Sequence, residues 1–174
     1  HMEFFRGIKN PIGIKLGPTV TPDELGKILA ILNPDNIPGR ISLITRMGSR
    51  QIASALPPLL RHCRHYGHQL VWICDPMHGN SMESSHGYKT RHFSDILSET
   101  QDFFAIHRAE GTHAGGLHCE LTARNVTECV GGMANIAESG LGERYESQCD
   151  PRLNAAQALE MAFLVADLLL PARI

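Results

Sequence analysis

The sequence predicts an α/β fold built on a parallel sheet, and three observations support this. Apolar runs that begin near residues 12, 41, 70 and 117 are each bounded by turn residues, as buried strands are. Amphipathic segments follow the first three runs, and another ends the chain. The first three runs start 29 residues apart (12 to 41, and 41 to 70), about the length of one βαβ step. Four tandem βα units are therefore expected.

The first two units are regular. We expect a strand over 12–16 and a helix over 22–32, because a threonine suited to an N-cap precedes a proline at the first helical position. The second strand is expected over 41–45. Its helix is expected to be capped by Ser49 and to end near Tyr66.

The last two units are less regular. The third strand is expected over 70–74 and its helix over about 94–109, with a polar stretch between them. The fourth strand is expected over 117–121. After a glycine-rich connection, a final amphipathic helix is expected to start at Asn154.

Length and composition fit one globular domain, which we expect over residues 2–174, with His1 left from cloning and Met2 as the start. Of the 174 residues, 43% are hydrophobic and 20% are charged, which is ordinary for such a domain. Four strands could form an open sheet or part of a barrel, since a closed (β/α)₈ barrel takes about 250 residues. Exposed sheet edges are a liability, so we expect a homo-oligomer or a second chain to cover them.

Charge and cysteine content exclude several classes of protein. The net charge of −2 gives no general attraction for nucleic acid or an anionic membrane, and no apolar stretch approaches the ~20 residues of a membrane span. The five cysteines are scattered without CxxC spacing. A reduced, cytoplasmic protein with buried thiols is therefore expected.

Charged and imidazole side chains lie at or just after the end of each predicted strand: Lys15, Arg46, His78 and Glu120, with Asp150 in the loop after the fourth unit. The carboxyl ends of parallel strands meet at one edge of a sheet, so these side chains are expected to converge. Two cations, an imidazole and two carboxylates suit a divalent metal beside a phosphorylated, carboxylated substrate. For any one of these residues, an ordinary surface ion pair explains the sequence equally well.

Six motifs cover nearly the whole chain and resemble the C-terminal half of one enzyme family, the class II (plant-type) 3-deoxy-D-arabino-heptulosonate 7-phosphate (DAHP) synthases of the shikimate pathway. Their order along the chain also matches that family. The motifs are NPIGIKLGPT (10–19), PGR with LI and RMG (38–48), CDPMHGN (74–80), GYKTRHF (87–93), GGLHCELT with NVTECVGG (115–132) and RYESQCDPRLN (144–154).

The resemblance implies half of a (β/α)₈ TIM barrel and an aldol-type condensation of phosphoenolpyruvate with erythrose 4-phosphate. It also implies a divalent metal, of which manganese is expected first and cobalt, iron or zinc are alternatives. His78, Glu120 and Asp150 match the metal ligands of the family. Lys15 and Arg46 match positions that bind phosphoenolpyruvate, and Lys89 lies near the same mouth. Lys15, Arg46 and His78 are the expected catalytic residues.

The family pattern is incomplete here. The fourth metal ligand of the family is a cysteine from the first half of the barrel, and no cysteine of this chain lies in a matching motif. The first-half phosphate motifs are absent as well. Three hypotheses follow: a homodimeric enzyme of half-barrels, half of a split or truncated synthase that needs a first-half partner, or a non-catalytic remnant that binds metal or phosphate.

Overall fold

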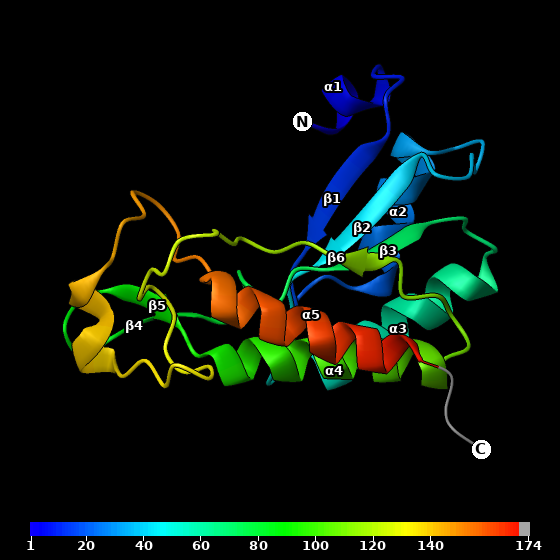
Figure 1. The fold of residues 1–174 in the computed structure, drawn as a ribbon. Helices are drawn as coiled ribbons and strands as arrows, with labels where there is room; N and C mark the ends of the chain where they lie inside the picture. The colour runs from blue at the N-terminus through cyan, green and yellow to red at the C-terminus, as the bar shows by residue number, and fades with distance from the viewer. Residues whose placement is uncertain (171–174) are drawn as a thin grey trace.

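The computed structural model describes residues 1–170 and has a four-stranded parallel sheet, as the sequence predicts (Figure 1). The strand order is β1-β2-β3-β6, so strands that follow one another along the chain are also neighbours in space. This order leaves β1 and β6 as the two edges, which is what one part of a barrel presents. The strands are β1 (Ile12–Leu16), β2 (Ile41–Thr45), β3 (Val71–Cys74) and β6 (Gly116–Leu117).

Four helices connect and flank these strands, and successive helices contact each other. α2 starts with a capping box between Thr21 and Glu24, and α5 starts with another between Asn154 and Gln157. The helix after β2 differs in detail from the prediction, because Gln51 rather than Ser49 is its N-cap and the Gln51 side chain makes no capping hydrogen bond. The helices are α2 (Pro22–Leu32), α3 (Ile52–His65), α4 (Phe93–Ala109) and α5 (Ala155–Leu169).

The core has two parts. The larger cluster joins the sheet to α2, α3 and α4, and includes the wholly buried Leu25, Ile41 and Leu43. The smaller cluster comprises Met77, Phe93, Ile96, Cys129, Leu153 and Met161, and lies under the loops at the carboxyl end of the strands. The opposite residues of β1 and β2 stay exposed or half-exposed, so the second face of the sheet is open.

The prediction of a fourth strand over 117–121 is wrong in extent. β6 pairs with β3 through only two residues, and the chain then diverges from the sheet. Leu121 instead forms a parallel bridge with Leu153, so this segment's backbone is paired with the loop before α5. The prediction fails because an extended apolar segment can pair with a loop as well as with a strand. The sequence of residues 117–121 does not determine which of these it pairs with.

Three short elements were not predicted. α1 (Met2–Arg6) precedes the sheet, and a two-stranded antiparallel hairpin lies in the polar stretch after β3. The hairpin consists of β4 (Ser81–Glu83) and β5 (Lys89–Arg91), and a 3₁₀ helix, η1 (Glu138–Glu143), lies near it at the end of the molecule away from α1 (Figure 1). These elements are three to six residues long, which is too short for a clear periodic signal.

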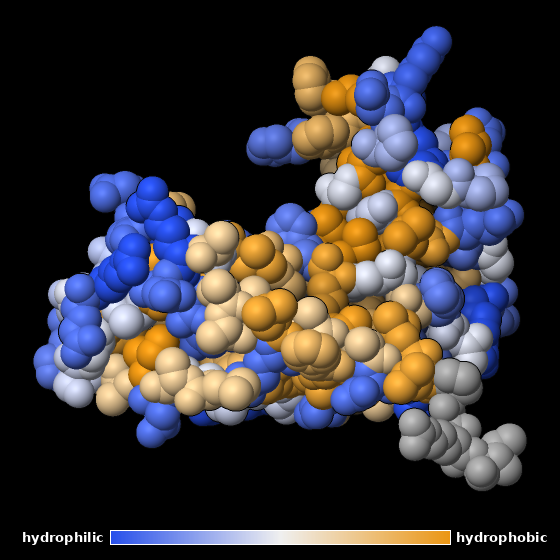
Figure 2. Space-filling model, viewed as in Figure 1, coloured by the Kyte–Doolittle hydropathy of each residue, from blue (hydrophilic) through white to orange (hydrophobic). Residues whose placement is uncertain are grey.

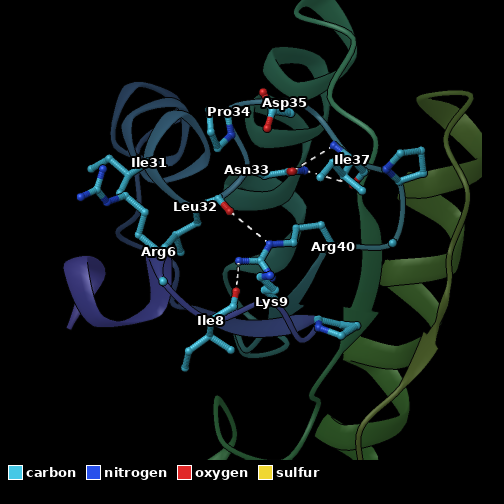
Figure 3. Close-up of a pocket in the computed structure, with 14 residues that line it drawn as sticks. Arg6, Ile8, Lys9, Ile31, Leu32, Asn33, Pro34, Asp35, Ile37 and Arg40 are labelled. Atoms are coloured by element: carbon cyan, nitrogen blue, oxygen red, sulfur yellow. Dashed lines mark hydrogen bonds between the residues drawn. The ribbon is translucent and has the colours of Figure 1, made fainter.

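A cavity of about 510 Å³ lies at the amino ends of β1 and β2, away from the predicted site (Figure 3). Arg40 lines it and donates hydrogen bonds to the backbone carbonyls of Ile8, Asn10 and Leu32. These bonds tie the segment before β1 to the end of α2. The cavity therefore reflects how the N-terminal segment is anchored, and none of the predicted site residues lines it.

One side of α5 is an exposed apolar surface (Figure 2). Leu159 and Phe163, one turn apart, have relative exposures of 62% and 71%, and Leu169 and Leu170 are also exposed. Surfaces of this kind are usually covered by another part of a protein or a partner.

None of the helices in residues 1–170 is both long and apolar enough to cross a membrane.

Candidate metal and anion site

Three predicted ligands meet beyond the carboxyl ends of β3 and β6. One donor atom from each of His78, Glu120 and Asp150 lies within 4.8 Å of the others. His78 Nε2 is 3.4 Å from Glu120 Oε1 and 3.5 Å from Asp150 Oδ2. Glu120 and Asp150 lie 42 and 72 positions after His78 in the sequence (120 − 78 and 150 − 78). The fold thus brings both carboxylates to one imidazole nitrogen.

The spacing of these donors fits a divalent cation. Two ligands that each lie about 2.1 Å from a metal ion are about 3.0 to 3.4 Å apart at angles between octahedral and tetrahedral. The distance from His78 Nε2 to Glu120 Oε1, 3.4 Å, is at the upper limit of this range, and the distance to Asp150 Oδ2, 3.5 Å, is slightly beyond it. An imidazole with two carboxylates is a donor set that manganese, iron, cobalt and zinc all accept. His78, Glu120 and Asp150 therefore fit a divalent metal ion.

Asp75 orients the imidazole. Its carboxylate Oδ2 lies 2.7 Å from His78 Nδ1, and its Oδ1 accepts hydrogen bonds from the backbone N–H groups of Met77 and His78. Asp75 is wholly buried, and burial alone would raise the pKa of its carboxyl group. Hydrogen bonds from Lys15 and His78 outweigh burial and lower that pKa, so Asp75 stays ionised and keeps the proton of His78 on Nδ1.

Two of the predicted anion-binding residues, both lysines, are paired with carboxylates at this rim. Lys15, at the end of β1, forms an ion pair with Asp75, and Lys89, in β5, forms one with Asp150. The bond from Lys89 lowers the pKa of Asp150. Lys15, Lys89 and the three candidate ligands therefore form one connected network.

Arg91 is a buried cation that sequence reasoning did not assign to the site. Its guanidinium is wholly buried, with Nη1 2.8 Å from Glu120 Oε2, and it also donates to the backbone carbonyl of Pro151. Its Nε donates to Ser81 Oγ at 3.2 Å. Nη2 is buried without a partner in the part of the chain that the structure describes. Arg91 thus fixes one oxygen of Glu120 and leaves the other toward His78.

Glu128 holds the loop that carries Asp150. It is wholly buried and accepts hydrogen bonds from the backbone N–H groups of Glu146, Ser147 and Arg152, and from the Arg152 guanidinium. Burial would raise the pKa of Glu128, but the bonds from Arg152 outweigh burial and lower it. Glu128 thereby orders the 146–152 loop.

Arg46 lies apart from this network. Its backbone N–H donates to the carbonyl of Leu16 at 2.8 Å, which holds it beside the end of β1. Its side chain is exposed and has no hydrogen bond or ion pair within the described residues, and Nη2 lies near Gly17. Of the predicted site residues, Arg46 is therefore the one whose side chain is free to meet a ligand.

Sequence reasoning missed the residues that hold the ligands in place: Asp75, Arg91 and Glu128. Asp75 carries a usable signal, because an aspartate directly after a buried strand and three residues before a histidine can bond to that histidine. The other two carry no local signal. Their partners are 29 and 24 residues away along the chain (Glu120 and Arg152), so only the folded structure identifies them.

Fold and site together define a class: an α/β protein with imidazole, carboxylate and cationic side chains gathered at the carboxyl end of a parallel sheet, where enzymes of this architecture place their active sites. Comparison with known proteins is more specific. Residues 1–166 match the model of the class-II DAHP synthetase family. The chain belongs to that family.

Three curated relatives cover almost the whole chain. It is 54% identical over 169 residues to the phospho-2-dehydro-3-deoxyheptonate aldolase AroG of Mycolicibacterium smegmatis, covering 97% of this chain and 36% of the relative. It is 52% identical over 169 residues to the phospho-2-dehydro-3-deoxyheptonate aldolase of Neurospora crassa (96% and 35%). It is 49% identical over 168 residues to that of Streptomyces coelicolor (97% and 37%). The chain thus spans about a third of the length of these relatives.

Proposed function

We propose that this chain supplies the metal-binding half of a DAHP synthase active site, which condenses phosphoenolpyruvate with an aldehyde such as erythrose 4-phosphate. The observation that carries the proposal is the convergence of His78, Glu120 and Asp150 within 4.8 Å in a chain of this family. These three side chains would hold a divalent cation, with manganese as the first candidate. When bound, the cation would polarise the carbonyl oxygen of the aldehyde substrate.

The cationic side chains bind and orient phosphoenolpyruvate. The exposed Arg46 guanidinium offers paired N–H donors, which suit a carboxylate or phosphate group. Lys15 and Lys89, paired with Asp75 and Asp150, add positive charge near the candidate ligands. Asp75 keeps Nε2 of His78 free of a proton by holding the proton on Nδ1.

A polypeptide that covers the open sheet completes the site in this proposal. The relatives carry the matching region within chains nearly three times as long, which favours a first-half segment as the completing part. The exposed apolar side of α5, with Leu159 and Phe163, supports a second candidate, a homodimer of half-barrels. Light scattering distinguishes these states: a stable dimer supports self-association, and a monomer that becomes active only with a co-expressed first-half chain excludes it.

The function is tested by phosphoenolpyruvate consumption with erythrose 4-phosphate and manganese, with and without a first-half chain. We expect manganese-dependent turnover in at least one arrangement, and His78→Ala should abolish both turnover and metal binding. Metal binding with no turnover in either arrangement would leave a non-catalytic binding protein. Unchanged metal affinity in His78→Ala would refute the metal site itself.

A further inference from the structure

Glu99 is a buried carboxylate outside the site described above. It lies in α4, is wholly buried, and has no cationic partner among residues 1–170. Burial raises its pKa to about 7, against the opposing effect of its hydrogen bonds. A buried acid without a cation is costly, so the bonds that it makes are informative.

All three hydrogen bonds of Glu99 go to the loops that follow β2 and β3. Oε1 accepts from the backbone N–H groups of Met47 and Gly48, both at 2.9 Å. Oε2 accepts from the Asn80 side-chain amide at 2.7 Å. Met47 directly follows Arg46, and Asn80 lies two residues after His78. One carboxylate thus links the two loops that carry these site residues.

Asn80 extends the link in both directions. Its Oδ1 accepts from the backbone N–H of Ser49 at 2.9 Å, in the loop after β2. Its Nδ2 donates to the backbone carbonyl of Pro76 at 2.9 Å, in its own loop. The side-chain oxygen of Asn80 therefore binds the loop after β2, and its side-chain N–H₂ group binds both its own loop and Glu99.

The two loops also touch through their backbones. A Cβ placed on Gly79 would lie 2.3 Å from the Gly48 nitrogen, and one placed on Gly48 would lie 2.7 Å from the Gly79 carbonyl oxygen. Only glycine permits this approach. The contact brings the loop of Arg46 against the loop of His78 at the point where Glu99 lies beneath both.

We propose that Glu99 is a positioning residue: through Met47, Gly48 and Asn80 it fixes the loop that carries Arg46 relative to the candidate metal ligands. The side chain of Arg46 has no partner of its own in the described region, so its placement depends on its backbone. His78 is held separately by Asp75. The proposal rests on the proposed function and adds a residue that touches neither cation nor substrate.

The test is a double-mutant cycle between Glu99→Gln and Arg46→Ala in the manganese-loaded chain, with phosphoenolpyruvate as the probe. In Glu99→Gln, the introduced side chain keeps one acceptor oxygen for Met47 and Gly48, but its N–H₂ group then faces the N–H₂ group of Asn80. We expect Glu99→Gln to weaken phosphoenolpyruvate binding about tenfold, as loss of one aligned bond to a charged group does. Manganese affinity should change less than twofold. In the Arg46→Ala background, Glu99→Gln should have no further effect.

Glu143→Gln is the matched control, because Glu143 is exposed in η1. Equal weakening by Glu99→Gln with and without the Arg46 side chain would overturn the proposal.

Hydrogen exchange of the Met47 and Gly48 amides is a second measurement, which does not depend on ligand binding. If the wild-type chain binds no phosphoenolpyruvate either alone or with a first-half chain, the proposed function fails on that point. Faster exchange of both amides in Glu99→Leu, which removes their acceptor oxygen, would still support the link between the loops, and unchanged exchange would refute it. Asn80→Ala tests the same link should Glu99→Gln fail to fold.

Discussion

Replacing Asp75 with asparagine should change which nitrogen of His78 carries the proton. Oδ1 of Asp75 accepts from two backbone N–H groups, at 3.0 Å (Met77) and 3.2 Å (His78), and an asparagine oxygen can keep both bonds. The asparagine N–H₂ group then takes the place of Oδ2, which lies 2.7 Å from His78 Nδ1. Because this group donates, Nδ1 becomes the acceptor and the proton moves to Nε2, the atom that faces Glu120.

The expected loss follows from the role of such partners in metal sites. Removing the group that orients a ligating histidine costs about 10- to 100-fold in metal affinity. That range equals about 1.4 to 2.7 kcal/mol of binding free energy. Isothermal titration calorimetry with Mn²⁺ near pH 7.5 measures it directly in Asp75→Asn and in the wild type. The variant should also release Lys15 from its ion pair with residue 75.

Asp102→Asn in α4 is the matched control, since Asp102 makes no hydrogen bond or ion pair within residues 1–170. It should bind Mn²⁺ within twofold of the wild type. Equal affinity in Asp75→Asn and the wild type would refute the tautomer argument. A parallel titration of His78→Ala then shows whether the imidazole is a ligand at all. Loss of Mn²⁺ binding in this variant would support His78 as a ligand, and unchanged binding would refute the metal site of His78, Glu120 and Asp150.

Two further predictions concern stability. Gly79→Ala should destabilise the fold by about 1–3 kcal/mol in urea unfolding, because its Cβ would meet backbone at 2.3 Å, whereas Gly7→Ala, with 3.6 Å to its nearest neighbour, should change little. His107, buried with its pKa lowered to about 4 mainly by burial, binds fewer protons when folded than when unfolded, so its contribution to stability falls as the pH drops from about 6.5 toward 4. Between pH 7 and 5 this loss is about 2 kcal/mol. Glu99, whose pKa is raised to about 7, acts in the opposite direction over the same interval, so the difference between the wild type and His107→Leu is the quantity to measure. An equal pH dependence in both proteins would show that His107 is not buried neutral.

The regular βα units could be predicted from the sequence. β1, β2, α2 and α5 lie where apolar periodicity and capping residues place them, to within a residue. The 117–121 segment could not, because its pairing changes partner from β3 to the loop at Leu153. Local sequence determines an extended conformation, but tertiary contacts determine its neighbour.

The candidate ligands could be proposed from sequence because each follows a strand or occupies a motif of the family. What holds them could not be proposed. Arg91 and Glu128 are charged residues in polar stretches, where a solvent-exposed side chain is the usual outcome. Both are wholly buried here because their partners come from loops that the chain brings in much later. Charge burial of this kind depends on three-dimensional pairing and leaves no periodic pattern.

The division of the core into two clusters has a consequence for the candidate ligands. Lys15 extends from a strand anchored in the larger cluster, whereas the loop of Asp150 joins α5 through Leu153, a member of the smaller one. Parts of a protein with few buried contacts open more often than its main core. The three donor atoms therefore stay close to one another only while the smaller cluster remains folded. Hydrogen exchange of the amides near Leu153 should measure how often this cluster opens, and global unfolding does not.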